Sequence, residues 1–145
     1  MDFLKSLKIS SSGMSAQRKR MNHIASNLAN METTRTAEGG PYKRKDVVFK
    51  AEPVTPFGRS LEASMGREGS VVTVEKVVED QNPPRKVYRP NHPDADREGY
   101  VAMPNVNQME EMVDMISATR SYEANAAVVK ASKSMALKAL EIGNR

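Results

Sequence analysis

The sequence predicts a mainly α-helical protein with a small β-rich insertion between two long terminal helices. Apolar residues recur at coiled-coil spacing near both ends of the 145-residue chain, and all eight prolines lie between these two stretches. Because proline interrupts helices, the middle segment must adopt another structure. We expect the terminal helices to pair as an antiparallel coiled coil. Residues 1–35 and 105–145 would form the two halves of this helical domain, and residues 36–104 a β-rich and loop module.

The first helix is predicted over residues 3–31. Leu7, Met14, Met21 and Leu28 recur every seven residues, which indicates a seam for another helix. The Ser-Ser-Ser-Gly stretch at residues 10–13 is a weak helix former and could bend or fray. Asparagine amides beside such a seam either fix its register or remain at the surface, and the sequence leaves both interpretations open.

The middle segment contains short β-branched runs separated by turn residues. Strands are predicted around residues 47–49, 71–78, 87–88 and 100–101, because valine, tyrosine and phenylalanine cluster there between glycines and prolines. The stretch from Pro53 to Gly69 has too little apolar content to hold a long loop in place, so we expect part of it to be mobile.

The last helix is predicted to begin with Asn105 as its N-terminal cap, since Gln108 follows three residues later as in a capping box. Gly143 is suited to end it. Its length, without proline or glycine from Asn105 to Ile142, predicts burial against other chains. Arg120 is expected to contact another subunit. The residues expected at the assembly interface of both helices are Leu7, Met14, Met21, Ile24, Asn27, Leu28, Asn30, Met109, Met112, Ile116, Arg120, Tyr122, Ala126, Val129 and Leu140.

The residue inventory indicates no catalytic, cofactor or metal site. The chain lacks cysteine, has two histidines, and shows no glycine-rich phosphate loop. Residues 91–99 resemble the start of a calcium loop, but the twelfth position from Asp94 is Asn105, where a bidentate glutamate is required. A rigid turn is therefore favoured over a metal site, and we expect the protein not to be an enzyme.

Charge and hydropathy argue against nucleic acid and membranes as partners. The net charge of +4 reflects a basic excess in the first helix, where Lys19 and Arg20 are expected to project away from the seam into solvent. The longest apolar run is four residues, Ala126 to Val129, so neither a membrane span nor a secretory signal peptide is expected.

Both ends also resemble a known family. Residues 12–17 (SGMSAQ), 24–30 (IASNLAN) and 33–34 (TT) resemble the N-terminal motif of bacterial flagellar rod and hook proteins. Residues 104–106 (PNV), 111–116 (EMVDMI) and 122–125 (YEAN) resemble the C-terminal motif of that family. Residues 39–42 (GGPY) and 92–95 (HPDA) are similar to those of its proximal-rod members.

This resemblance implies an axial structural subunit of the flagellar basal body, located in the periplasmic space. Its partners would be copies of itself and other rod proteins, including adjoining distal-rod and base components. It would be exported by the flagellar type III apparatus without a cleaved signal peptide. Two other classes remain open from the residues alone: a coiled-coil adaptor or structural subunit of another secretion or axial assembly, and a peptidoglycan-remodelling enzyme.

Overall fold

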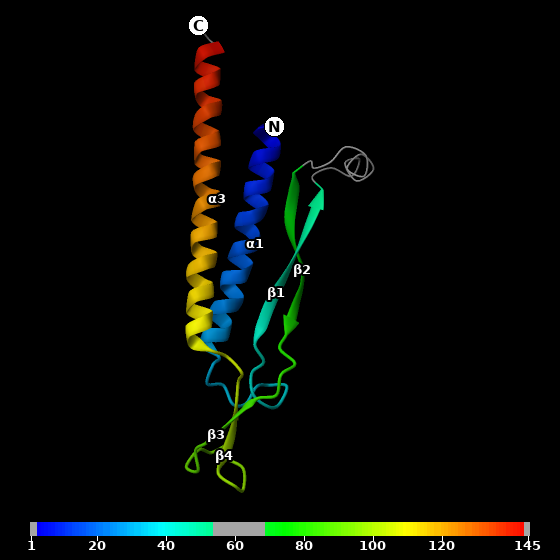
Figure 1. Ribbon diagram of the computed structural model, residues 1–145, viewed down its shortest axis with the longest axis vertical. Coiled ribbons are helices and arrows are strands. Elements are labelled where there is room, and N and C mark those ends of the chain that lie inside the picture. Colours follow the sequence, from blue (N-terminus) through cyan, green and yellow to red (C-terminus); the bar gives the residue numbers. More distant parts are fainter. Residues whose placement is uncertain (1–2, 54–68, 144–145) are drawn as a thin grey trace.

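The computed structural model describes residues 3–53 and 69–143, and it confirms the predicted fold class. Two long helices, α1 (Phe3–Ala29) and α3 (Gln108–Gly143), flank four strands in the chain order. They lie side by side and run in opposite directions (Figure 1). The expectation of mobility between Pro53 and Gly69 concerns residues 54–68, which lie outside the described residues.

The four strands form two separate antiparallel pairs. β1 (Lys45–Pro53) pairs with β2 (Ser70–Glu79), and β3 (Arg85–Tyr88) pairs with β4 (Tyr100–Met103). All four predicted strands are confirmed, because each of the four runs lies within one strand. The β1–β2 pair packs along α1, whereas β3 and β4 project beyond the end of the helix pair where α3 begins (Figure 1).

The weak helix stretch in α1 is fully helical, contrary to the suggested bend. The Ser12 hydroxyl donates to the carbonyl of Ile9 at 2.7 Å and accepts the backbone N–H of Val72 at 3.0 Å. Ser10 is buried, so this part of the helix is held by contacts to neighbouring elements. The small side chains therefore serve close packing, which outweighs their low intrinsic helix propensity.

The predicted cap of the last helix is wrong by two residues. α3 begins at Gln108, and the side-chain oxygen of Asn107 accepts the backbone N–H of Met109 at 3.1 Å. Asn105 instead donates to the carboxylate of Asp80 at 3.2 Å. Asn107 therefore has the geometry of an N-terminal cap, and Asn105 belongs to the connection with the β module.

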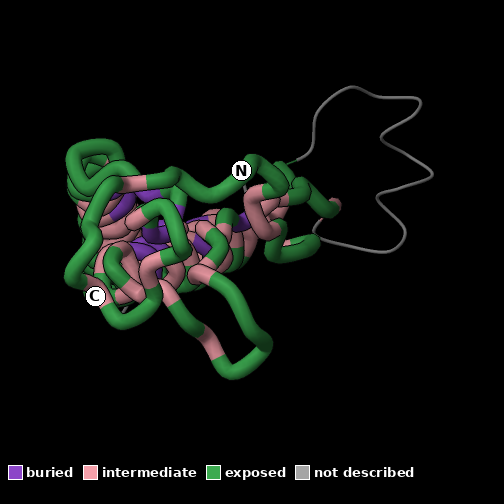
Figure 2. Tube along the Cα trace, turned by 90° about the horizontal axis from the view of Figure 1, so that it is seen from below, coloured by how far each residue is buried: buried purple, intermediate pink, exposed green. Residues whose placement is uncertain are grey.

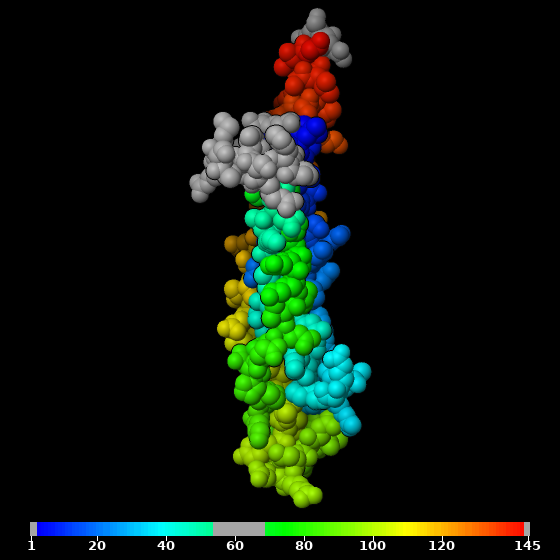
Figure 3. Space-filling view, turned by 90° about the vertical axis from the view of Figure 1, so that its right-hand side faces the viewer, coloured from blue at the N-terminus to red at the C-terminus, as the bar shows by residue number. Residues whose placement is uncertain are grey.

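The buried residues lie in the interior of the described chain and are surrounded by half-buried and exposed ones (Figure 2). The buried apolar residues of the described chain are Ala16, Ile24, Val47, Val101, Met103, Val106 and Ala118. The described chain has an elongated shape with much exposed surface (Figure 3). No described helix combines the length and hydropathy needed to cross a membrane.

Candidate assembly interface

Small residues bring α1 and α3 close together within the chain. Ala16 and Ala118 are buried at the seam, and Gly13 faces Asn125 so closely that a Cβ atom on Gly13 would lie 3.1 Å from the Asn125 amide nitrogen. On α3 the seam residues recur every seven positions, as Glu111, Ala118, Asn125 and Ser132. This spacing keeps one narrow stripe against α1.

The predicted interface residues of α1 mostly face this seam or the β module. Ile24 and Asn27 are buried, and the other five are half-buried: Leu7, Met14, Met21, Leu28 and Asn30. The Thr119 hydroxyl lies 3.5 Å from the sulfur of Met21, which shows that the heptad position of Met21 reaches α3. Asn30 bonds locally, donating to the carbonyl of Ser26 at 2.8 Å.

The predicted interface residues of α3 separate into two groups. Tyr122, Ala126 and Val129 are half-buried, whereas five others are exposed: Met109, Met112, Ile116, Arg120 and Leu140. α1 packs against the stripe of α3 that runs through Glu111 and Ala118. The five exposed residues are not part of this contact. Contact of these exposed residues with other subunits stays a prediction.

The first turns of α3 present an apolar stripe to solvent. Met109, Val113 and Ile116 are 68%, 63% and 54% exposed, and Met112 lies beside them with 45% of its surface accessible. Their three- and four-residue spacing places them on one helix face, opposite the seam. We call these four residues the α3 outer stripe. Contiguous exposed apolar side chains of this kind are typical of protein-binding surfaces.

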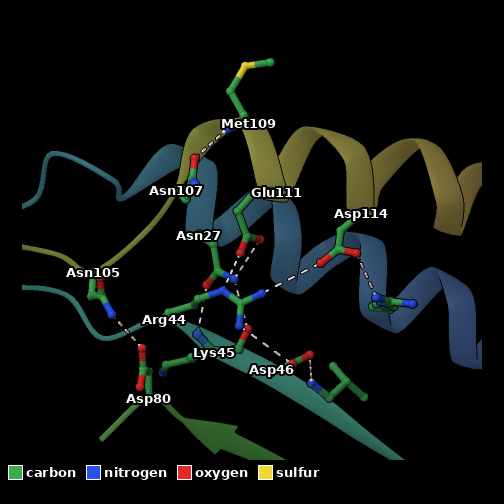
Figure 4. Close-up of polar contacts among 12 residues, drawn as sticks. Asn27, Arg44, Lys45, Asp46, Asp80, Asn105, Asn107, Met109, Glu111 and Asp114 are labelled. Carbon is green, nitrogen blue, oxygen red and sulfur yellow. Dashed lines mark hydrogen bonds and ion pairs between the residues drawn. The ribbon is translucent and has the colours of Figure 1, made fainter. Parts of the chain in front are cut away.

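A buried polar cluster joins the helix pair to the β module at the start of β1 (Figure 4). We call Asn27, Arg44 and Glu111 the junction cluster. Asn27 is 1% exposed, and its amide nitrogen donates to a Glu111 carboxylate oxygen at 3.0 Å and to the Lys45 carbonyl at 2.9 Å. Its oxygen accepts the Lys45 backbone N–H at 3.0 Å and the Tyr42 hydroxyl at 2.9 Å. The Asn27 side chain is thus fully hydrogen-bonded, as a buried amide requires.

Glu111 has no exposed surface and forms an ion pair with Arg44. The Arg44 Nε donates to one Glu111 oxygen while Asn27 donates to the other. Burial opposes the charged form of Arg44, but the hydrogen bond and the negative charge of Glu111 outweigh it and raise the pKa of the guanidinium. Arg44 also lies 3.7 Å from Asp46 and 3.8 Å from Asp114.

Arg20 differs from the sequence expectation of a solvated side chain. Its guanidinium donates to a carboxylate oxygen of Asp114 at 3.1 Å, across the two helices. It is half-buried, whereas Lys19 is exposed as expected. The separation of the two neighbours arises because successive helix positions are rotated by about 100°.

An open cleft of about 660 Å³ lies beside the junction cluster, where α3 begins. Its lining includes Asp80, Met109, Glu110 and Val113, so part of the α3 outer stripe forms one wall. The backbone N–H of Asn82, followed by the side-chain amides of Asn105 and Asn82, lowers the pKa of the Asp80 carboxyl. This exposed carboxylate is occupied in holding the connection between β2 and the start of α3.

The calcium-like segment forms an internally bonded turn. One Asp96 oxygen accepts the backbone N–H groups of Glu98 and Tyr100 at 2.9 and 2.8 Å, and the Thr34 hydroxyl donates to Asp94 at 2.7 Å. Gly99 has a φ of 82°, which favours glycine in such a turn. Within residues 3–53 and 69–143, no three acidic, histidine or cysteine side chains gather in a metal-binding geometry.

Comparison with known proteins identifies the relatives of this chain. Residues 7–35 match the family model "Flagella basal body rod protein", and residues 97–142 match "Flagellar basal body rod FlgEFG protein C-terminal". The flagellar basal-body rod protein FlgC of Bacillus subtilis is 47% identical, over 95% of this chain and 96% of the relative. FlgC proteins of Borreliella burgdorferi and Salmonella typhimurium are 42% and 43% identical, covering 98% and 99% of both chains. The sequence resemblance to flagellar rod proteins is thereby confirmed, and the chain belongs to the FlgC family of flagellar basal-body rod proteins.

Proposed function

We propose that this chain is a structural subunit of the bacterial flagellar basal-body rod. The observation that carries the proposal is the similarity to FlgC proteins, which extends over nearly the full length of both chains. The architecture agrees with this role, because long helices that bury only one narrow stripe each retain wide surfaces for neighbouring subunits. The work of the protein on this account is mechanical, and we propose no catalytic step.

The α3 outer stripe is the surface that we assign to contacts between subunits. Its four apolar residues are exposed in the single chain, and burying them against neighbours would be favourable by about 25 cal/mol for each Å² removed from water. Arg120 continues the same face one turn beyond Ile116. Leu140 lies near the far end of α3 and is a separate exposed contact.

In this proposal the helical domain, residues 1–35 and 105–145, forms the inner tube of the rod, and residues 36–104 form an outer layer. Lengthwise packing of long helices gives a stiff tube, since twisting it would require many interdigitated side chains to slide at once. Such a tube is suited to transmit torque.

The partners that follow are copies of this chain and other rod proteins, including the adjoining distal-rod and base components. We further propose export through the flagellar type III apparatus and assembly in the periplasmic space. The absence of cysteine is compatible with that route, because no disulfide has to form after export.

The test replaces Ile116 with aspartate in a bacterium whose rod depends on this chain. A charge at an interface that excludes water is costly, so Ile116→Asp should abolish incorporation into basal bodies and motility. Expression should be unchanged, because Ile116 is exposed and makes little contribution to the fold of the single chain.

The matched control is Val77→Asp, which places the same charge at an exposed apolar residue of β2. Circular dichroism of both purified variants establishes that the helices are retained. Normal motility with Ile116→Asp would refute the proposed role of the stripe. A discrete soluble oligomer in place of rod incorporation would favour the adaptor class instead.

A further inference from the structure

We propose that Glu111 is the residue that sets the register of the helix pair and, through Arg44 and Asn27, the direction of the β module relative to it. This inference goes beyond the role of the chain as a rod subunit, because it concerns how one chain selects a single arrangement of its own elements. Glu111 acts as a positioning residue on this account.

The seam side of α3 repeats small or medium-sized side chains, so more than one register is conceivable. Ala118, Asn125 and Ser132 repeat every seven residues and are all small or medium-sized, and the facing side of α1 includes Gly13 and Ala16. A slip of α3 by seven residues, about 10.5 Å along the helix axis, would place Asn125 at the site of Ala118, which has no exposed surface, and Ser132 opposite Gly13. Packing at the seam therefore favours the observed register, although small side chains face α1 in both.

The junction cluster does distinguish between them. In the observed register Glu111 accepts from both Asn27 and Arg44 and has no exposed surface. A seven-residue slip would place Ala118 opposite Asn27, so the buried amide would lose its carboxylate partner. Glu111 would lose both donors. Unpaired buried polar groups are costly, and a single buried polar pair is a known means of fixing helix register.

The same cluster reaches the β module through backbone atoms. Asn27 both donates to the carbonyl and accepts the N–H of Lys45, the first residue of β1. Arg44, immediately before β1, forms an ion pair with Glu111 of α3. The start of β1 is thus held by one side chain from each terminal helix. Correct pairing of the helices and correct placement of the β1–β2 sheet are therefore coupled.

The first test measures register by disulfide trapping, for which the cysteine-free chain is a clean background. Met21→Cys with Thr119→Cys reports the observed register, because these side chains are in contact. Met21→Cys with Ala126→Cys reports the slipped register, since Ala126 would then take the place of Thr119. In the observed register residue 126 is about 10 Å further along α3, beyond disulfide reach.

Each reporter pair is combined with Glu111→Leu, and with Glu110→Leu as the matched control at the exposed neighbouring glutamate. We expect the ratio of native to slipped cross-link to be high in the control. This ratio should fall by about tenfold or more in Glu111→Leu, because the slipped register then no longer leaves a buried carboxylate without hydrogen-bond donors. Leucine fills a similar volume, so the helices should remain folded. If circular dichroism shows loss of helix, Glu111→Met provides the same comparison, because methionine also removes the carboxylate.

An equal ratio in the folded Glu111 variant and in the control would overturn the proposal. A ratio near one in both chains would also overturn it, because the register would then not be selected at all. Neither outcome depends on rod assembly, since the measurement uses the purified chain. Failure of this inference is therefore distinguishable from failure of the proposed function.

The second test measures the coupling to the β module. Spin labels at Lys76→Cys on β2 and Lys130→Cys on α3, both exposed, report the distance between sheet and helix by pulsed electron paramagnetic resonance. We expect one narrow distance distribution with Glu110→Leu and a broadened or bimodal distribution with Glu111→Leu. An unchanged narrow distribution with Glu111→Leu would refute the coupling.

Discussion

Replacing Asn27 with alanine should destabilise the chain more than replacing any other asparagine of α1. The Asn27 side chain makes hydrogen bonds to Glu111, to Tyr42 and to both backbone groups of Lys45, and it is 1% exposed. Alanine removes all of these contacts. The Lys45 N–H and one Glu111 oxygen then lose a partner, and Glu111 has no exposed surface.

The magnitude follows from the cost of such unpaired groups. Each buried donor or acceptor without a partner costs about 1–3 kcal/mol. Lys45 and Tyr42 are half-buried, so water can partly replace Asn27 there, whereas Glu111 retains Arg44. We therefore expect a total loss of about 2–4 kcal/mol from the free energy of unfolding. For a chain of this size that corresponds to a fall in melting temperature of roughly 10 °C.

The assay is urea and thermal unfolding of the purified chain, followed by far-ultraviolet circular dichroism. Asn30→Ala is the matched control, because Asn30 directly follows α1, is half-buried and donates to the carbonyl of Ser26. Its loss should cost less than about 1 kcal/mol. Equal destabilisation by the two substitutions would refute the reasoning, since it would mean that the junction cluster contributes no more than a surface asparagine.

Three further outcomes follow from the same structure. Arg44→Ala should cost about 3 kcal/mol or more in urea unfolding, because it leaves the fully buried Glu111 without its cation. Gly13→Leu should lower the melting temperature by overpacking the seam against Asn125, and a second change, Asn125→Gly, should restore part of the loss. The lowered pKa of Asp80 means that its bonds stabilise the fold above its ordinary pKa and are lost as the pH falls through the lowered value. Asp80→Asn should therefore reduce the acid sensitivity of unfolding below about pH 4.

The arrangement of elements was largely predictable from sequence. The heptad at Leu7, Met14 and Met21 indicated a helix with a partner, and the β-branched runs located all four strands. Local signals of this kind are strong when they repeat over several turns or alternate between glycines and prolines. The start of α3 was less predictable, because both Asn105 and Asn107 are followed by residues compatible with a helix. The structure distinguishes them, because Asn105 donates to Asp80 whereas Asn107 accepts the backbone N–H of Met109.

The composition of the seam and of the junction cluster could not be predicted. α3 carries apolar residues on more than one face, so spacing alone favoured Met112 and Ile116 over the small residues that pack against α1. Glu111 has the sequence appearance of an ordinary helix-surface acid beside Glu110. Its burial depends on Arg44, which is 67 residues away in the chain, and such pairing leaves no periodic signal.

The central claim is that the α3 outer stripe is exposed in the single chain and buried by neighbouring subunits in the rod. Single cysteines introduced at Ile116 and, as a control, at the exposed Arg97 can be labelled with a maleimide in the purified chain and in isolated basal bodies. The account predicts rapid labelling of both positions in the free chain and strong protection at position 116 alone in basal bodies. Equally rapid labelling of position 116 in free and assembled protein would contradict it.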